Sequence, residues 1–106
     1  YQRDRDQWPV FRTQSAEVLM QKADSFIAYV QAKGKRPVVC FYLHPWEFHP
    51  MPQGALDFGE SSVKPLPFIV KNCGPKAVKQ LDRVIAMFKQ RGGRFVTAKE
   101  LAAEHA

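Results

Sequence analysis

His44 is the residue of this sequence best placed to do chemistry. It directly follows the run V-V-C-F-Y-L at residues 38–43, which is rich in strand-favouring residues. Active sites of parallel barrels lie at the carboxyl ends of their strands, so a titratable residue there is a candidate catalytic group. The alternative is a histidine that only ends a strand and bonds to backbone. Position alone leaves both interpretations open.

Glu47 and Trp46 lie on the loop that follows His44. A carboxylate near a catalytic histidine can orient its ring, so Glu47 is a candidate orienting group. The alternative role for Glu47 is to pair with an arginine and hold the loop. Aromatic rings either stack on the faces of sugars or cover a core. Among the loop aromatics, Trp46 is the one we expect to touch a ligand.

A metal site is not predicted within this chain. His49 is the nearest second histidine, but its spacing from His44 does not match the familiar zinc patterns. Cys40 lies inside the apolar run and is predicted to be buried. Cys73 precedes a predicted helix start, where a thiol pKa can fall, but the favoured interpretation is an ordinary thiol.

The elements that must position these residues are predicted from caps and apolar spacing. Ser15 is a predicted N-cap for a helix that Gly34 ends. Pro75 suits the first position of a second long helix. Thr97 begins a capping-box pattern for a short last helix. Residues 38–43 and 94–97 are predicted strands, and residues 66–70 a short extended piece.

The predicted order is helix, strand, helix, strand, helix, which is typical of an α/β fold with a parallel sheet. Two strands do not form a stable parallel sheet alone. We therefore predict the last part of a (β/α) barrel, incomplete on its own. Residues 1–106 form one segment with no internal boundary. A missing N-terminal segment or a second chain would complete the sheet.

Charge and hydropathy exclude some partners. The net charge is +6, with 16 Lys and Arg against 10 Asp and Glu, but the basic residues are scattered. No phosphate loop or nucleic-acid signature is present, so no nucleic-acid partner is predicted. A basic surface for an anionic polymer is the weaker alternative, and it predicts salt-dependent binding. No apolar stretch reaches the roughly 18 residues of a membrane span. The compartment is not indicated.

The segment F-Y-L-H-P-W-E-F at residues 41–48 resembles a segment near the C-terminus of many bacterial polysaccharide deacetylases of the NodB-homology type, a carbohydrate esterase family 4-like group. The preceding run W-P-V-F-R at residues 8–12 is similar to the run that leads into that segment. The run G-G-R-F-V-T at residues 92–97 resembles the family's closing strand. The resemblance covers essentially the whole chain.

The resemblance implies a distorted, incomplete (β/α) barrel that removes N-acetyl groups from amino sugars of a polysaccharide or oligosaccharide. It implies a divalent metal, often zinc, held by an Asp and two His of the N-terminal half. It also implies that His44 protonates the leaving amine, as a general acid. Tyr42 and Leu43 would line the pocket for the acetyl methyl group.

This chain departs from the family pattern at several points. It contains no Asp-Asp strand end and no H-x-x-x-H pair, and Tyr42 replaces the small hydrophobic residue of many members. We therefore expect this segment to be inactive alone, although the complete protein would be a hydrolase. The alternative from another class is a non-catalytic α/β module that completes its sheet with a partner chain.

Overall fold

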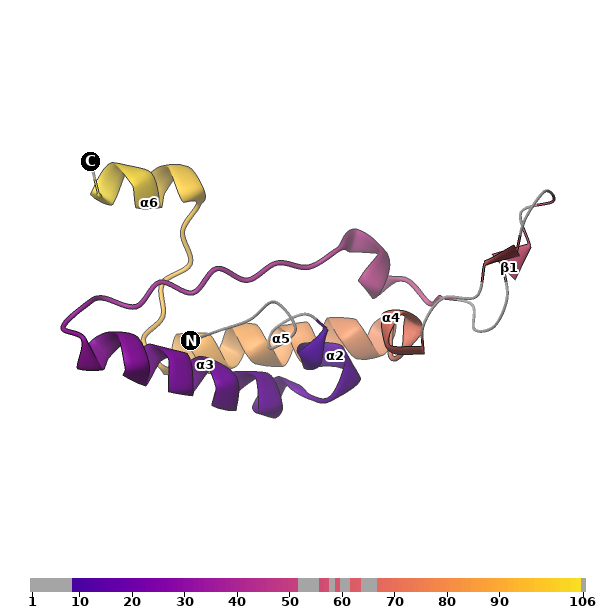
Figure 1. The fold of residues 1–106 in the computed structure, drawn as a ribbon, viewed down its shortest axis with the longest axis horizontal. Coiled ribbons are helices and arrows are strands. Elements are labelled where there is room, and N and C mark those ends of the chain that lie inside the picture. The colour runs from indigo at the N-terminus through magenta and orange to yellow at the C-terminus, as the bar shows by residue number, and fades with distance from the viewer. Residues whose placement is uncertain (1–8, 52–55, 58, 60–61, 64–66, 106) are drawn as a thin grey trace.

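The computed structural model describes residues 9–51, 56–57, 59, 62–63 and 67–105, and this part of the chain is mainly helical. Figure 1 shows two long helices side by side, with an extended segment running along them. The elements in chain order are α2 (Val10–Thr13), α3 (Ala16–Ala32), the 3₁₀ helix η1 (Pro45–Phe48), β1 (Leu56–Asp57), β2 (Ser62–Val63), α4 (Pro67–Val70), α5 (Pro75–Gln90) and α6 (Ala98–Glu104).

The N-cap predictions for the long helices are confirmed. The Ser15 hydroxyl accepts a hydrogen bond from the Val18 nitrogen at 3.2 Å, which begins α3. Gly34 follows that helix with a φ of 69°, a conformation that favours glycine. Pro75 occupies the first position of α5, after Gly74.

The buried face of α5 differs from the predicted one by one residue. The apolar spacing predicts Val78 in the core, but 51% of its surface is exposed. Ala77, the residue before Val78, is buried in its place. Val84, which the spacing places beside the apolar stripe, is buried as well, and Leu81 and Phe88 of the stripe pack against the core.

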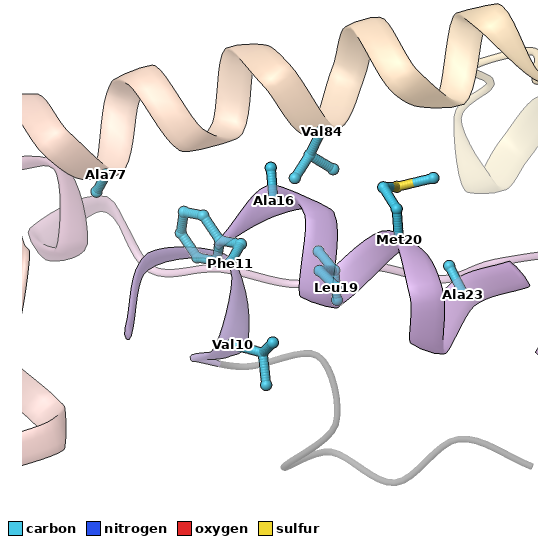
Figure 2. Close-up of a cluster of buried hydrophobic side chains, with 8 residues drawn as sticks. All are labelled: Val10, Phe11, Ala16, Leu19, Met20, Ala23, Ala77 and Val84. Carbon is cyan, nitrogen blue, oxygen red and sulfur yellow. The ribbon is translucent and has the colours of Figure 1, made fainter. Parts of the chain in front are cut away.

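The core lies where α2, α3 and α5 meet. Phe11 of α2 is completely buried there. Its ring centroid lies 5.8 Å from that of Phe41 and 6.1 Å from that of Phe48. Burying a side chain of this size stabilises the fold by roughly 1.5–3 kcal/mol. Figure 2 shows the eight residues of the cluster: Val10, Phe11, Ala16, Leu19, Met20, Ala23, Ala77 and Val84.

The prediction of an α/β fold, as the last part of a (β/α) barrel, is wrong. Residues 38–43 are extended, but the part of the chain that the structure describes forms no sheet with them. The described strands are β1 and β2, which form a two-residue antiparallel pair with Leu56 opposite Val63. A strand requires a hydrogen-bonded neighbour, and strand propensity in one segment does not supply it.

The extended segment nevertheless packs with a two-residue alternation. Phe41 and Leu43 lie against the core cluster. Val38 and Tyr42 face outward, with 41% and 39% of their surfaces exposed. The helices α3 and α5 therefore cover one side of this segment.

The other predicted extended pieces are also corrected. Residues 94–97 form no strand, and 57% of the Phe95 surface is exposed. The predicted extended piece at residues 66–70 begins outside the described residues, and its remainder is the helix α4. Thr97 does cap α6, because its hydroxyl accepts from the Glu100 nitrogen and the Glu100 carboxylate accepts from the Thr97 nitrogen.

The molecule is elongated, with principal extents of 54 × 29 × 22 Å and a radius of gyration of 16.6 Å. A compact domain of this length has a radius of gyration of about 13 Å. The excess reflects α6 and the β1–β2 pair, which lie apart from the two long helices in Figure 1, and α6 has no buried residue. No helix in the described ranges has the length and apolarity required to cross a membrane.

Candidate functional site

The candidate site is built on η1, immediately after the extended segment. Pro45 occupies the first position of this short helix, where its fixed φ suits the turn. Glu47 is its third residue, and its side chain folds back to the residue before the helix. Its Oε2 accepts a hydrogen bond from the His44 backbone nitrogen at 2.7 Å. One turn of chain therefore places a carboxylate beside the histidine.

The Glu47 carboxylate also contacts the His44 ring. Oε2 lies 3.1 Å from His44 Nδ1. The Glu47 side chain is completely buried, whereas 39% of the His44 side chain is exposed. A carboxylate only accepts, so the hydrogen of this contact lies on Nδ1 of the His44 ring. The orienting role considered for Glu47 has the geometry it requires.

Two aromatic rings flank His44. The Trp46 ring stacks on the imidazole, with centroids 5.2 Å apart and an interplanar angle of 23°. Tyr42 meets the imidazole edge-on, with centroids 5.8 Å apart. The structure therefore brings the side chains of Tyr42, Trp46 and Glu47 into contact with His44. Leu43 belongs instead to the half-buried side of the segment and packs against the core.

Arg12 of α2 binds the second oxygen of Glu47. The distance from Arg12 Nε to Glu47 Oε1 is 2.6 Å, and both side chains are completely buried. The Arg12 Nη1 donates to the carbonyl oxygens of Phe68 and Lys71 at 3.0 and 2.7 Å. Its Cζ lies 5.6 Å from the Trp46 ring centroid. The Glu47 carboxylate thus contacts the His44 ring through one oxygen and pairs with Arg12 through the other.

Sequence reasoning did not identify Arg12 as part of the site. A signal was present: Arg12 interrupts the apolar run V-F-R-T, and η1 carries a carboxylate that needs a partner. Charged residues are rarely completely buried unless they are paired. The pairing itself joins positions 35 residues apart, and no local pattern predicts a contact of that range.

The connection between α4 and α5 ties the site together through its backbone. Asn72, with a φ of 59°, donates from Nδ2 to the Arg12 carbonyl oxygen at 2.8 Å. The Gly74 nitrogen donates to the Glu47 carbonyl oxygen at 2.8 Å. A β-carbon on Gly74 would lie 3.1 Å from Pro50, so glycine permits this close approach.

The described residues do not fit a zinc site. No group of three or more His, Cys, Asp or Glu side chains gathers anywhere in the described ranges. The Nδ1 of His49 lies 2.9 Å from the carbonyl oxygen of its neighbour Pro50.

Of the two cysteines, Cys40 differs from the expectation. Cys40, predicted to be buried, is exposed, because the alternation of the extended segment turns it outward. Cys73 is half-buried and donates to the Ile69 carbonyl oxygen at 3.4 Å. Burial raises the pKa of the Cys73 thiol, despite the nearby Arg12 charge. A thiol with a raised pKa is a poor nucleophile at neutral pH, which argues against a nucleophilic role for Cys73.

Comparison of the chain with protein-family models, with curated proteins and with solved structures gave no match. The resemblance to polysaccharide deacetylases therefore rests on the residues of this sequence.

Proposed function

We propose that this chain supplies the general acid of a metal-dependent deacetylase that removes N-acetyl groups from amino sugars of a polysaccharide. His44 is the acid. The divalent metal, zinc by the family resemblance, would be held by residues outside this chain and would activate the attacking water. The main support is the geometry of His44, whose Nδ1 lies 3.1 Å from a buried carboxylate while the ring remains partly exposed.

The chemistry required of His44 is proton delivery to a poor leaving group. An amine leaves readily only when it is protonated. As the C–N bond of the tetrahedral adduct breaks, its electron pair goes to nitrogen, and the imidazolium transfers its Nε2 proton to that nitrogen. The ring ends neutral, with its hydrogen on Nδ1. The Glu47 carboxylate stabilises the charged ring before the transfer, as the carboxylate of a catalytic triad does.

The aromatic neighbours support a sugar substrate. Tyr42 is 39% exposed and lies edge-on to His44, while Trp46 stacks on the imidazole. Sugar rings present C–H faces that pack on aromatic faces, and binding sites combine apolar surface with a few polar groups. The side chains around His44 therefore supply both the acid and an apolar surface for a saccharide.

The test is acetate release from N-acetylglucosamine oligomers in the presence of zinc. The 106-residue chain alone is expected to release none. In the longer protein that carries the metal, His44→Ala should lower kcat by about 10²–10⁴-fold. His49→Ala is the matched control, since it removes a loop imidazole without touching Glu47. Equal activity of the His44→Ala and wild-type proteins would exclude the proposal.

A second candidate is a non-catalytic interaction module, favoured by the extended segment. Residues 38–43 expose Val38, Cys40 and Tyr42 on one side and join no described sheet. In this alternative, the segment pairs with its copy in a second molecule. Sedimentation would then show a dimer that Tyr42→Lys disrupts. A monomer at all concentrations would exclude it.

A further inference from the structure

We propose that Arg12 is a positioning residue for His44, that it acts through Glu47, and that residues 68–72, which run from α4 into its connection to α5, hold Arg12 in place. The orientation of the His44 ring would then be set by a segment that begins 24 residues later in the sequence, at Phe68. The catalytic consequence rests on the proposed function, whereas the structural part of the inference does not.

Arg12 and Glu47 stabilise each other as a buried pair of opposite charges. Both Arg12 and Glu47 have completely buried side chains. A buried charge without a partner is strongly unfavourable, so each of these residues makes the other tolerable in the interior. Without Arg12, the Glu47 carboxylate would have to bind a proton, turn outward or admit water. Each of these changes alters the group that His44 contacts.

The two carboxylate oxygens of Glu47 bind different partners. Oε1 accepts from Arg12 Nε at 2.6 Å. Oε2 accepts from His44 at both the backbone nitrogen and Nδ1, at 2.7 and 3.1 Å. Two donors on one oxygen and a third on the other fix the plane of the carboxylate. That plane determines the direction in which the imidazole Nδ1–H points.

Backbone carbonyl groups hold the Arg12 guanidinium in place. Its Nη1 donates to the Phe68 and Lys71 carbonyl oxygens, at the C-terminal end of α4. The last carbonyl groups of a helix lack partners within it and attract a cation. Asn72 adds a hydrogen bond to the Arg12 carbonyl oxygen. Side chain and backbone of Arg12 are therefore both bound by the same short segment.

The tautomer of His44 reports this chain of contacts directly. Histidine labelled with ¹⁵N in the 106-residue chain distinguishes hydrogen on Nδ1 from hydrogen on Nε2 in the neutral ring. The His49→Gln and His105→Gln variants assign the His44 signals. In the wild type, the Nδ1–H form of His44 should dominate. In Arg12→Gln, a folded chain should show a mixture of both forms, as should Glu47→Gln.

Controls separate positioning from general loss of structure. Arg91→Gln removes an exposed arginine that binds Asp24 through two hydrogen bonds, and it should leave the His44 tautomer unchanged. Asn72→Gly keeps the positive φ and Arg12 itself but loses the Nδ2 bond, and should shift the tautomer partway. If Arg12→Gln does not fold, Asn72→Gly decides the matter. A wild-type population of the Nδ1–H form in folded Arg12→Gln, or in Asn72→Gly, would overturn the proposal.

Activity of the longer protein separates this inference from the proposed function. Arg12→Gln should lower kcat by about 10–100-fold, with a smaller effect on KM, as loss of a supporting contact does. In a His44→Gln background, Arg12→Gln should have no further effect on kcat. If Arg12→Gln shifts the tautomer but substitution of His44 leaves kcat unchanged, the positioning role of Arg12 stands and the acid role of His44 is excluded.

Discussion

Arg12 and Glu47 form a completely buried ion pair, with Nε of one 2.6 Å from Oε1 of the other. The pair joins α2 to η1, and Arg12 adds two hydrogen bonds to the carbonyl oxygens of Phe68 and Lys71. The most buried polar contact in the described chain is therefore also the one that supports the candidate site.

Removing one partner of this pair should destabilise the fold strongly. Glu47→Ala leaves Arg12 buried without its counter-charge, and we expect the free energy of unfolding to fall by about 3–5 kcal/mol. Urea unfolding followed by far-ultraviolet circular dichroism measures the change. The double variant Arg12→Met/Glu47→Leu should recover part of the loss, because no charge is then buried, although the Phe68 and Lys71 carbonyl oxygens and the His44 nitrogen lose their partners. A single-variant loss below about 1 kcal/mol would contradict burial of the pair.

The ion pair between Asp24 and Arg91 predicts a pH dependence of stability. Hydrogen bonds from Arg91 lower the pKa of Asp24 below its ordinary value of 3.8. The pKa in the folded state is thus below that in the unfolded state, so the contribution is present above pH 3.8 and disappears as the pH falls through the lower folded value. Both side chains are partly exposed, so the contribution is roughly 0.2–1 kcal/mol.

The measurement for Asp24 is urea unfolding between neutral pH and the onset of acid unfolding. Asp24→Asn should lower stability at neutral pH and match the wild type at the acid end. High salt should shrink the difference, since screening weakens exposed pairs. A constant difference across the pH range would contradict the assigned cause.

Gly74 should tolerate substitution less well than Gly34. Both have positive φ, at 96° and 69°. A β-carbon at Gly74 would also lie 3.1 Å from Pro50, whereas at Gly34 it would meet nothing within 4 Å. Gly34→Ala should therefore carry only the backbone strain, roughly 1–2 kcal/mol. Gly74→Ala should lower the midpoint of thermal unfolding further, and equal midpoints would contradict the close approach.

Thr97 should control the order of α6. This helix has no buried residue, so its order depends on its capping box with Glu100 and on the exposed ion pairs of Glu104 with Arg94 and Arg36. Thr97→Ala removes the acceptor for the Glu100 nitrogen. Amide hydrogen exchange should quicken across α6 and stay unchanged in α3. Faster exchange in both helices would indicate that α6 supports the core after all.

The sequence predicts the helices better than the site or the sheet. Ser15, Pro75 and Thr97 mark helix starts by local chemistry, and each prediction is confirmed. Strand pairing is not local, which is why residues 38–43 read as a strand but join no described sheet. Contact between Glu47 and His44 follows from a spacing of three residues, whereas the contribution of Arg12 depends on a contact across the fold.

The outward alternation of the extended segment leaves Cys40 accessible to reagents. Cys73 is half-buried, and its raised pKa keeps little of it as the reactive thiolate. A maleimide or a spin label should therefore attach at Cys40 first, without mutagenesis. The attached group would lie four residues from His44, close enough to report on what approaches the imidazole. The chain thus carries its own attachment point for a spectroscopic probe of the candidate site.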